Sequence, residues 1–214
     1  MRTGKNEKAI NLLESISTDN TLNEELFKQN LALAYYAVGN KKLRKTLEEY
    51  NDICHNNCMD VFSFFTVAER EEYWTRISRE LLLVNNLVAE KYPLMTDIAF
   101  DNLLFVKNLK LMSSDILKGM ADNSSNPELK RKYDRILTLR NDISYRSSEQ
   151  DSVRIWKKEL DAEERNILNM MPDYKKKLLG IYHKWNEIKG ALGDDEVAID
   201  FTYAPQLNDW NNAT

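Results

Sequence analysis

The residues best suited to bind a metal ion or to act as nucleophiles lie at positions 54–58, where the run CHNNC contains two cysteines and a histidine. A tetrahedral zinc site needs four such ligands, and this run supplies at most three. The second histidine, His183, stands alone. Neighbouring residues on a helix point about 100° apart, so Cys54 and His55 would not form a catalytic dyad. We therefore interpret the cysteines as two thiols at a helix end, in a reducing compartment.

Carboxylates are the other residues that could do chemistry, and they gather at positions 69–72, 161–164 and 194–196. A helical di-metal site needs Glu-x-x-His pairs, and the sequence contains none; Asp52 and His55 come nearest. Phosphate-loop, dinucleotide, nucleophile-elbow and His-Glu-x-x-His motifs are also missing from the sequence. We expect no cofactor and no metal, and we predict a protein that is not an enzyme. An enzyme built on the acidic groups or on the Cys–His pair is the alternative from another class.

The composition of the chain indicates which classes of partner to expect. The chain has 214 residues and a net charge of −4, with 43% hydrophobic and 30% charged residues. A nucleic-acid-binding protein usually carries a basic stripe, whereas the basic runs at 130–132 and 175–177 lie near acidic residues, so we expect no nucleic-acid partner. No apolar run approaches the roughly 18 residues of a membrane span. The first residues lack a signal-peptide core, which predicts a cytoplasmic protein without a membrane partner.

The elements that must position these residues are helices. Only six glycines and four prolines interrupt the chain, which favours long helices and an all-α fold. Capping boxes at 21–24 and 66–69 predict helix starts. Gly39 and the pair Tyr92-Pro93 predict helix ends. Asn126 and Pro127 are typical of an N-cap and the first helical position. Residues 51–60 are expected to form a loop or a frayed end, and one last helix is expected from the lysine run at 175–177 to Gly193.

Two sets of residues stand out as candidates for a role beyond simple packing. Asp101 and Asn108 lie two turns apart on one helix face, with Asn102 and Lys107 beside them, which predicts a buried structural polar network. Aromatic residues are dense in the first third of the chain. We interpret most of them as core, and the alternative is a partner-binding surface. The candidate residues for that surface are Tyr35, Tyr36, Phe64 and Phe65.

The end of the chain does not follow the helical pattern. Residues 197–203 read VAIDFTY, which is rich in β-branched and aromatic residues. This composition predicts a single β-strand at about 196–203. A lone strand leaves its backbone groups unpaired, so it needs a partner strand from elsewhere.

Residues 30–40, NLALAYYAVGN, resemble the first helix and turn of a tetratricopeptide repeat. The resemblance implies α-hairpins that stack on one another. The small residues Ala32 and Ala34 would allow close helix contact, and Gly39 would make the turn. Arg44 departs from the repeat, because a small residue is typical at that position. We expect tetratricopeptide-like hairpins that continue into an irregular helical array.

A second resemblance covers roughly residues 60–203. Its motifs are FFTVAEREEYW (64–74), AFDNLLFVKNLKL (99–111), YDRIL (133–137), ERNIL (164–168), WNEI (185–188) and DEVAIDF (195–201). Their order resembles the helical segment that precedes the peptidase domain of bacterial CHAT proteins, which are caspase-like and separase-related. The resemblance implies that residues 195–201 begin the peptidase domain. The catalytic His and Cys of the family would follow residue 214, so no catalytic residue carries over to this chain.

These observations predict three regions: tetratricopeptide-like repeats at 1–58, a helical scaffold at 59–193, and the start of a CHAT-like domain at 194–214. The predicted function is a non-catalytic scaffold that binds protein or peptide partners and positions or regulates a C-terminal peptidase domain. The alternative is a self-contained helical adaptor that binds a peptide or protein in its groove.

Overall fold

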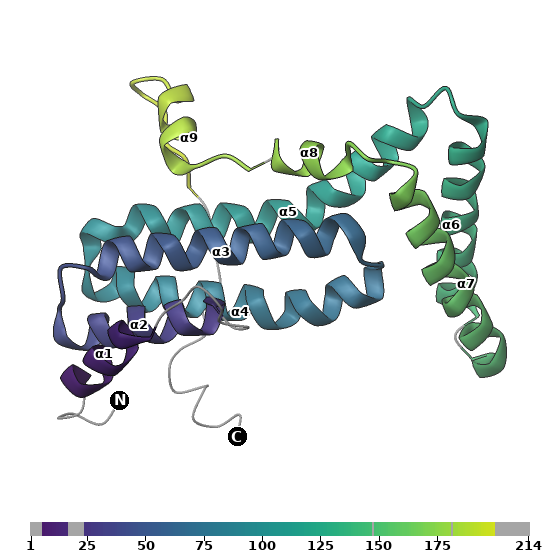
Figure 1. Cartoon of the computed structure of the whole chain (residues 1–214). Helices are drawn as coiled ribbons and strands as arrows, with labels where there is room; N and C mark the ends of the chain where they lie inside the picture. Colours follow the sequence, from purple (N-terminus) through teal and green to yellow (C-terminus); the bar gives the residue numbers. More distant parts are fainter. Residues whose placement is uncertain (1–5, 17–23, 147, 181, 200–214) are drawn as a thin grey trace. The chain divides into compact units, whose positions relative to one another are not determined.

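In a computed structural model (Figure 1) we describe residues 6–16, 24–146, 148–180 and 182–199. These residues form helices joined by turns, and none of them lies in a β-strand, so the predicted all-α class is confirmed for this part of the chain. The elements in order are α1 (Asn6–Ser15), α2 (Glu24–Val38), α3 (Leu43–Phe64), α4 (Val67–Lys91), the short 3-10 helix η1 (Pro93–Met95), α5 (Thr96–Asp122), α6 (Pro127–Tyr145), α7 (Gln150–Asn169), α8 (Tyr174–Leu179) and α9 (Trp185–Ala191).

The chain divides into two compact units, and neither of them is continuous in sequence. The first unit contains the chain through Asn57, then Arg76–Val106, and then the chain from His183 onward. The second unit contains Cys58–Thr75 and Lys107–Tyr182. Helices α3, α4 and α5 therefore each contribute residues to both units. The predicted regions 1–58, 59–193 and 194–214 are linear, whereas the observed units are interleaved.

The core of the first unit forms between α2, α3, α4 and α5. Its largest fully buried side chains are Tyr35, Tyr50, Leu43, Leu47, Ile77, Leu81 and Phe105. Helix α1 lies against α2, and Ile10 is its buried contact (Figure 1). Gly39 ends α2 with a φ of +68°, the left-handed conformation that glycine adopts without strain. The predicted turn at Gly39 is thus confirmed.

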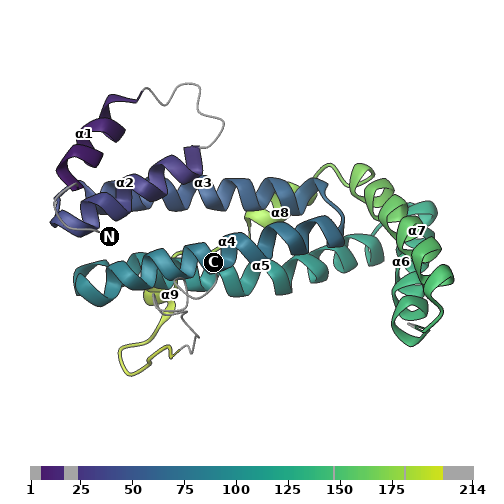
Figure 2. The same cartoon turned by 90° about the horizontal axis from the view of Figure 1, so that it is seen from below.

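The second unit is centred on the helical pair α6 and α7, which lie side by side in both views (Figures 1 and 2). Ile136, Leu139 and Ile167 are fully buried in this unit. Helix α8 adds Tyr174, whose hydroxyl donates a hydrogen bond of 3.0 Å to the Ser113 carbonyl. Phe62 and Trp74 meet edge to face at 5.4 Å, so the end of α3 and the start of α4 belong to the same core.

Several predicted helix ends are confirmed. At the start of α4, the Thr66 amide donates to Glu69 Oε2 at 2.9 Å and the Glu69 amide donates to Thr66 Oγ1 at 3.5 Å. This is the reciprocal pair of a capping box. Asn126 Oδ1 accepts from the Glu128 amide at 3.0 Å, with Pro127 at the first helical position. The capping box expected at 21–24 lies outside the described residues except for Glu24, where α2 begins.

The prediction of a loop or a frayed helix end at 51–60 is wrong, because α3 runs without a break through this stretch to Phe64. Tyr50, Cys54 and Cys58 are fully buried and lie four residues apart, so they continue one face of the helix into the core. Two polar residues of this stretch, Asn51 and His55, are also buried. Both have partners on other helices, as described below.

The last helix is also shorter than expected. The stretch from the lysine run to Gly193 forms two helices, because α8 ends at Leu179 and α9 begins at Trp185. Gly180 is the C-cap of α8, and its amide donates to the carbonyls of Lys176 and Lys177. These bonds close the final turn of α8 and end the helix.

The predicted C-terminal strand is not observed in the part that can be described. Residues 196–199 have no regular secondary structure, and Val197 and Ile199 are largely exposed. The remaining positions of that prediction lie outside the described residues. Among the described helices, none has the length and apolar character needed to cross a membrane.

One buried carboxylate connects three helices of the second unit. Glu164 on α7 is only 3% exposed. Its Oε2 accepts a hydrogen bond of 2.7 Å from the amide of Val67, the first residue of α4, and its Oε1 accepts one of 2.9 Å from Arg140 on α6. A carboxylate is favoured at a helix N-terminus because the amides there carry a partial positive charge. Glu164 thereby fixes α4 and α6 relative to α7.

Substitution of Glu164 by alanine is expected to lower the free energy of unfolding by about 2–3 kcal/mol, because it removes the buried carboxylate that accepts from the Val67 amide and from the half-buried Arg140 guanidinium. Urea denaturation followed by circular dichroism measures the change. The control is Glu159→Ala on the same helix. Glu159 pairs with Arg135 at the surface, and the expected loss is about 1 kcal/mol or less. Equal losses in the two variants would contradict a special role for Glu164.

Candidate functional site

The strongest candidate for an interaction site is the turn between α3 and α4, at residues 64–67, which we term the α3–α4 corner. Its apolar side chains point largely into solvent: Phe64 is 64% exposed, Phe65 44% and Val67 36%. Three apolar side chains so close together are unusual on a surface, since isolated exposed apolar residues are the normal case. Phe64 and Phe65 were among the predicted partner-binding residues.

The backbone of the corner is held in place by polar contacts on both sides. Arg70 Nε donates a hydrogen bond of 2.6 Å to the Phe65 carbonyl, and the Phe65 amide donates to the Val61 carbonyl at 3.0 Å. The capping box fixes Thr66, and Glu164 accepts from the Val67 amide. The corner is therefore a rigid turn with exposed apolar side chains.

Charged residues surround the base of the corner. Glu69 accepts a hydrogen bond from the Thr66 amide and pairs with Arg165 at 2.7 Å, and these contacts hold the pKa of its carboxyl below the usual value. The pKa of Asp161 is raised, because the residue is partly buried and lies near the carboxylates of Glu164 and Glu69. The acidic groups at 69–72 and 161–164, which were singled out in the sequence, thus meet at the N-terminus of α4.

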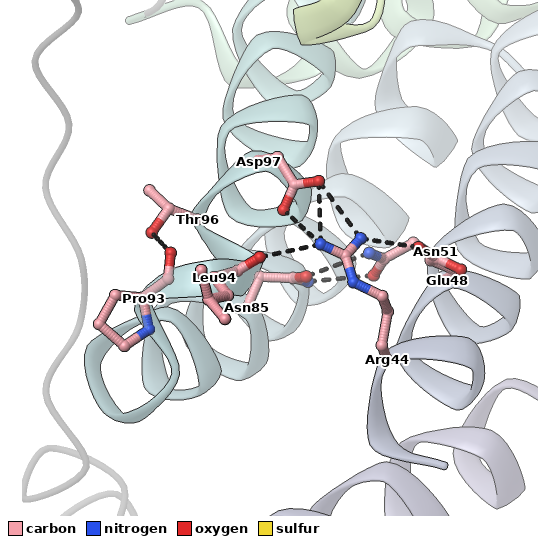
Figure 3. A network of polar contacts seen from close by, with 8 residues as sticks. All are labelled: Arg44, Glu48, Asn51, Asn85, Pro93, Leu94, Thr96 and Asp97. Atoms are coloured by element: carbon pink, nitrogen blue, oxygen red, sulfur yellow. Dashed lines mark hydrogen bonds and ion pairs between the residues drawn. The ribbon is translucent and has the colours of Figure 1, made fainter. Parts of the chain in front are cut away.

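Another polar network lies in the first unit, at the start of α3 (Figure 3). Arg44 NH2 binds the carboxylate of Asp97 with both of its oxygens, at 3.0 and 3.1 Å, and also reaches the Leu94 carbonyl at 2.9 Å. Asp97 is in the first turn of α5 and Leu94 is in η1. The hydrogen bond to Asp97 raises the pKa of the Arg44 guanidinium. Arg44 thus ties the start of α3 to the start of α5.

Two amide side chains pair inside the same unit. Asn51 Nδ2 donates to Asn85 Oδ1 at 3.1 Å, and Asn85 Nδ2 donates back to Asn51 Oδ1 at 3.0 Å (Figure 3). Both residues are at most 5% exposed. Asn85 Nδ2 also reaches the Leu81 carbonyl on its own helix at 2.8 Å. The pair joins α3 to α4 by complementary hydrogen bonds in an apolar environment, where such bonds are strong.

His55 makes the corresponding connection between α3 and α5. Its Nε2 lies 2.6 Å from Asn102 Oδ1, and its ring stacks on Phe105 with the centroids 3.9 Å apart. Burial lowers the pKa of His55 to about 4, because a charged imidazole loses its hydration in the core. The ring is therefore neutral at pH 7, with Nε2 donating to the Asn102 oxygen. Asn102 Nδ2 is buried without a hydrogen-bond partner among the described residues.

The four residues of the predicted polar network occupy different places. Asn102 is fully buried and bound to His55, whereas Asp101 accepts a hydrogen bond of 2.5 Å from the Trp185 amide at the start of α9. Burial raises the pKa of Asp101. Lys107 and Asn108 are half-buried and belong to the second unit. His55, the hydrogen-bond partner of Asn102, was not predicted, although its spacing of four from Asn51 and its place between two cysteines are visible in the sequence.

The four residues predicted to form a partner-binding surface also differ in their exposure. Tyr35 is only 2% exposed, and its hydroxyl donates to Glu14 Oε1 at 2.5 Å, so this residue belongs to the core and not to a surface. Tyr36 is half-buried; Lys91 lies over its ring at 4.6 Å and Tyr92 meets it edge to face at 5.9 Å. Phe64 and Phe65 are the exposed members of the predicted set.

Comparisons with models of protein families, with curated proteins and with solved structures find no match to this chain. The candidate site therefore has to be interpreted from its own geometry.

Acidification is expected to weaken the first unit through His55. The imidazole has a pKa of 6.5 when unfolded and about 4 when buried. The unfolded chain thus binds more protons between these values, and stability present above pH 6.5 is lost as the pH falls toward 4. The expected decrease from His55 is about 2 kcal/mol between pH 7 and pH 5.

Urea unfolding at a series of pH values measures this effect. The His55→Gln variant should lose most of the pH dependence in this range. The His183→Gln variant, which leaves the core unchanged, should retain it. A His55→Gln variant with the full pH dependence of the natural chain would show that another group is responsible.

Proposed function

We propose that this chain is a non-catalytic helical scaffold that binds a protein partner at the α3–α4 corner. The observation that carries the proposal is the contrast between a fixed backbone and exposed side chains. Four hydrogen bonds hold residues 65–69 in one conformation, while Phe64, Phe65 and Val67 remain in contact with solvent. A preorganised apolar surface loses little conformational entropy on binding, and aromatic side chains provide much of the contact energy at interfaces.

The residues that suggested chemistry have structural roles that fit a scaffold. His55 is buried and neutral against Phe105, and Cys54 and Cys58 are fully buried in α3. Glu69 and Glu164 hold the N-terminus of α4. In the proposed scaffold these residues hold the helices that present the corner.

Exchange of both corner phenylalanines for serine is expected to abolish partner binding and to leave folding intact. The rings are largely exposed, so the free energy of unfolding of the Phe64→Ser, Phe65→Ser variant should change by about 1 kcal/mol or less. The matched control is Ile155→Ser on α7, which alters an apolar side chain of similar exposure elsewhere in the second unit.

Site-specific photo-crosslinking in extracts of the source cell identifies the partner. A photoreactive phenylalanine analogue at position 64 should crosslink to a defined protein, and the same analogue at Tyr145, which is 87% exposed, should not. An excess of the natural chain or of Ile155→Ser should compete for the partner, whereas the double serine variant should fail to compete. Identical crosslinks from positions 64 and 145 would refute the proposal.

The resemblance to CHAT proteins suggests a specific form of this function, in which the partner is a caspase-like peptidase domain that the scaffold positions or regulates. The reading frame of the native gene beyond codon 214 tests this form directly. If a domain with its own His and Cys follows, the peptidase activity of the whole protein should change when Phe64 and Phe65 are replaced by serine. If no such domain follows, the self-contained adaptor is the remaining form of the proposal.

A further inference from the structure

Helix α1 is attached to the first unit by a small contact. The helix has 10 residues, of which Ile10 is the buried one, whereas Leu12 is 65% exposed. It lies against α2 (Figure 1). Isolated helices shorter than about 12–15 residues are marginally stable in water. Helix α1 therefore depends on the rest of the unit for its structure, although it buries little against it.

The polar part of this contact is one carboxylate. Glu14 Oε1 accepts a hydrogen bond of 2.5 Å from the Tyr35 hydroxyl and one of 2.7 Å from Lys42 Nζ. The bonds from Lys42 and Tyr35 hold the pKa of the Glu14 carboxyl below its usual value. Burial and the nearby carboxylate raise the pKa of Tyr35 to about 12, so the phenol keeps its proton and donates it. Tyr35 and Lys42 thus form a site for a carboxylate, which we term the α1 contact surface.

Contacts that do not involve α1 hold the α1 contact surface in place. The Lys42 amide donates to Asn40 Oδ1 at 2.9 Å, which fixes the turn before α3. Lys28 on α2 pairs with Glu49 on α3 at 2.5 Å, so the helix that carries Tyr35 is joined to α3 directly. A phenol donor and an ammonium group therefore keep their positions when α1 dissociates. Such a preorganised surface loses little conformational entropy when it binds another carboxylate.

We propose that α1 is replaceable, and that a helix of a protein partner takes its place on the α1 contact surface. The partner helix presents an apolar residue and, four positions later, a glutamate, as α1 presents Ile10 and Glu14. Residues four apart lie on one face of a helix, so both can reach the surface together. Helix α1 is then an internal competitor that the partner displaces.

This second surface does not depend on the proposed function. The α1 contact surface belongs to the first unit, whereas the α3–α4 corner belongs to the second. The corner binds through exposed aromatic side chains, and the α1 contact surface binds through a carboxylate and a buried apolar residue.

Hydrogen exchange of the natural chain, followed by NMR, tests whether α1 dissociates by itself. The amides of residues 10–15 should exchange about 100-fold or more faster than those of Ala32 and Leu47, which are fully buried in α2 and α3, because local opening costs less than unfolding of the unit. Equal rates would show that α1 opens only with the whole unit, and would overturn the proposal.

A peptide probe tests whether another helix can take the place of α1. The probe is a fluorescent alanine–glutamine helix of about 16 residues with one isoleucine and, four positions later, one glutamate. The full-length Ile10→Ser variant weakens its own α1 and should bind the probe about tenfold or more tightly than the natural chain, because the surface is free more often. Leu12→Ser changes an exposed residue of the same helix and should bind as the natural chain does.

Fluorescence anisotropy measures probe binding, and circular dichroism shows that α2–α9 remain folded in both variants. Equal binding by the natural chain and Ile10→Ser, or binding by neither, would overturn the proposal.

Further variants test the chemistry of the surface. In the Ile10→Ser chain, Tyr35→Phe should weaken the probe about tenfold by removing a hydrogen bond to a charged group, and so should a probe with glutamine in place of glutamate. Tyr36→Phe removes the hydroxyl of the neighbouring tyrosine and should have no effect. Unchanged binding after both Tyr35→Phe and the exchange in the probe would contradict the carboxylate site.

Light scattering separates a partner helix from a second copy of this chain. The natural chain should be monomeric at the concentrations of the probe experiment. A dimer that Ile10→Ser loses would show that the surface takes α1 of a second copy instead, and would overturn the proposal.

The two proposals fail separately. The Phe64→Ser, Phe65→Ser variant should leave probe binding unchanged in the Ile10→Ser chain, and Tyr35→Phe should leave the crosslink from position 64 unchanged. Loss of the crosslinked partner in the corner variant without probe binding would leave the scaffold function in place and refute the α1 contact surface.

Discussion

The arrangement of the first unit depends on one constraint: polar side chains that α3 buries must find partners on its neighbours. Asn51 and His55 lie one turn apart on this helix and face the core. Asn51 pairs with Asn85 on α4, and His55 pairs with Asn102 on α5. An unpaired buried amide or imidazole costs about 1–3 kcal/mol, so a shift of either helix along its axis is disfavoured. Apolar contacts alone would tolerate such a shift more easily, and the two polar pairs therefore fix the register.

In the second unit a charged group, the carboxylate of Glu164, is buried and needs partners on neighbouring helices. Its two oxygens accept hydrogen bonds from the amide at the N-terminus of α4 and from Arg140. Surface ion pairs such as Arg135–Glu159 contribute little by comparison, since water screens them. The same carboxylate that joins α7 to α4 also fixes the backbone of the α3–α4 corner. Glu164 thus contributes both to the packing of the second unit and to the fixed backbone of the candidate binding surface.

Local signals in the sequence predicted the ends of the helices well. The capping box at Thr66, the Asn126–Pro127 pair and Gly39 each act within a few residues, so they can be identified without the fold. The region 51–60 was mistaken for a loop because its polar residues find their partners far away. Asn51 and Asn85 are 34 residues apart, and His55 and Asn102 are 47 apart. The candidate site shows the same limit: Tyr35 and Phe64 are both aromatic residues in amphipathic helices, and only the packing places one inside and the other outside.

The interleaved order of the two units has a consequence for synthesis on the ribosome. Domains usually fold in the order in which they emerge, beginning with the N-terminal one. Here the last residue of the second unit is Tyr182, whereas the first unit also includes the segment from His183 onward. Trp185 can reach Phe100 and Asp101 only after that point. The unit that contains the N-terminal helices is therefore the last to be completed in the nascent chain.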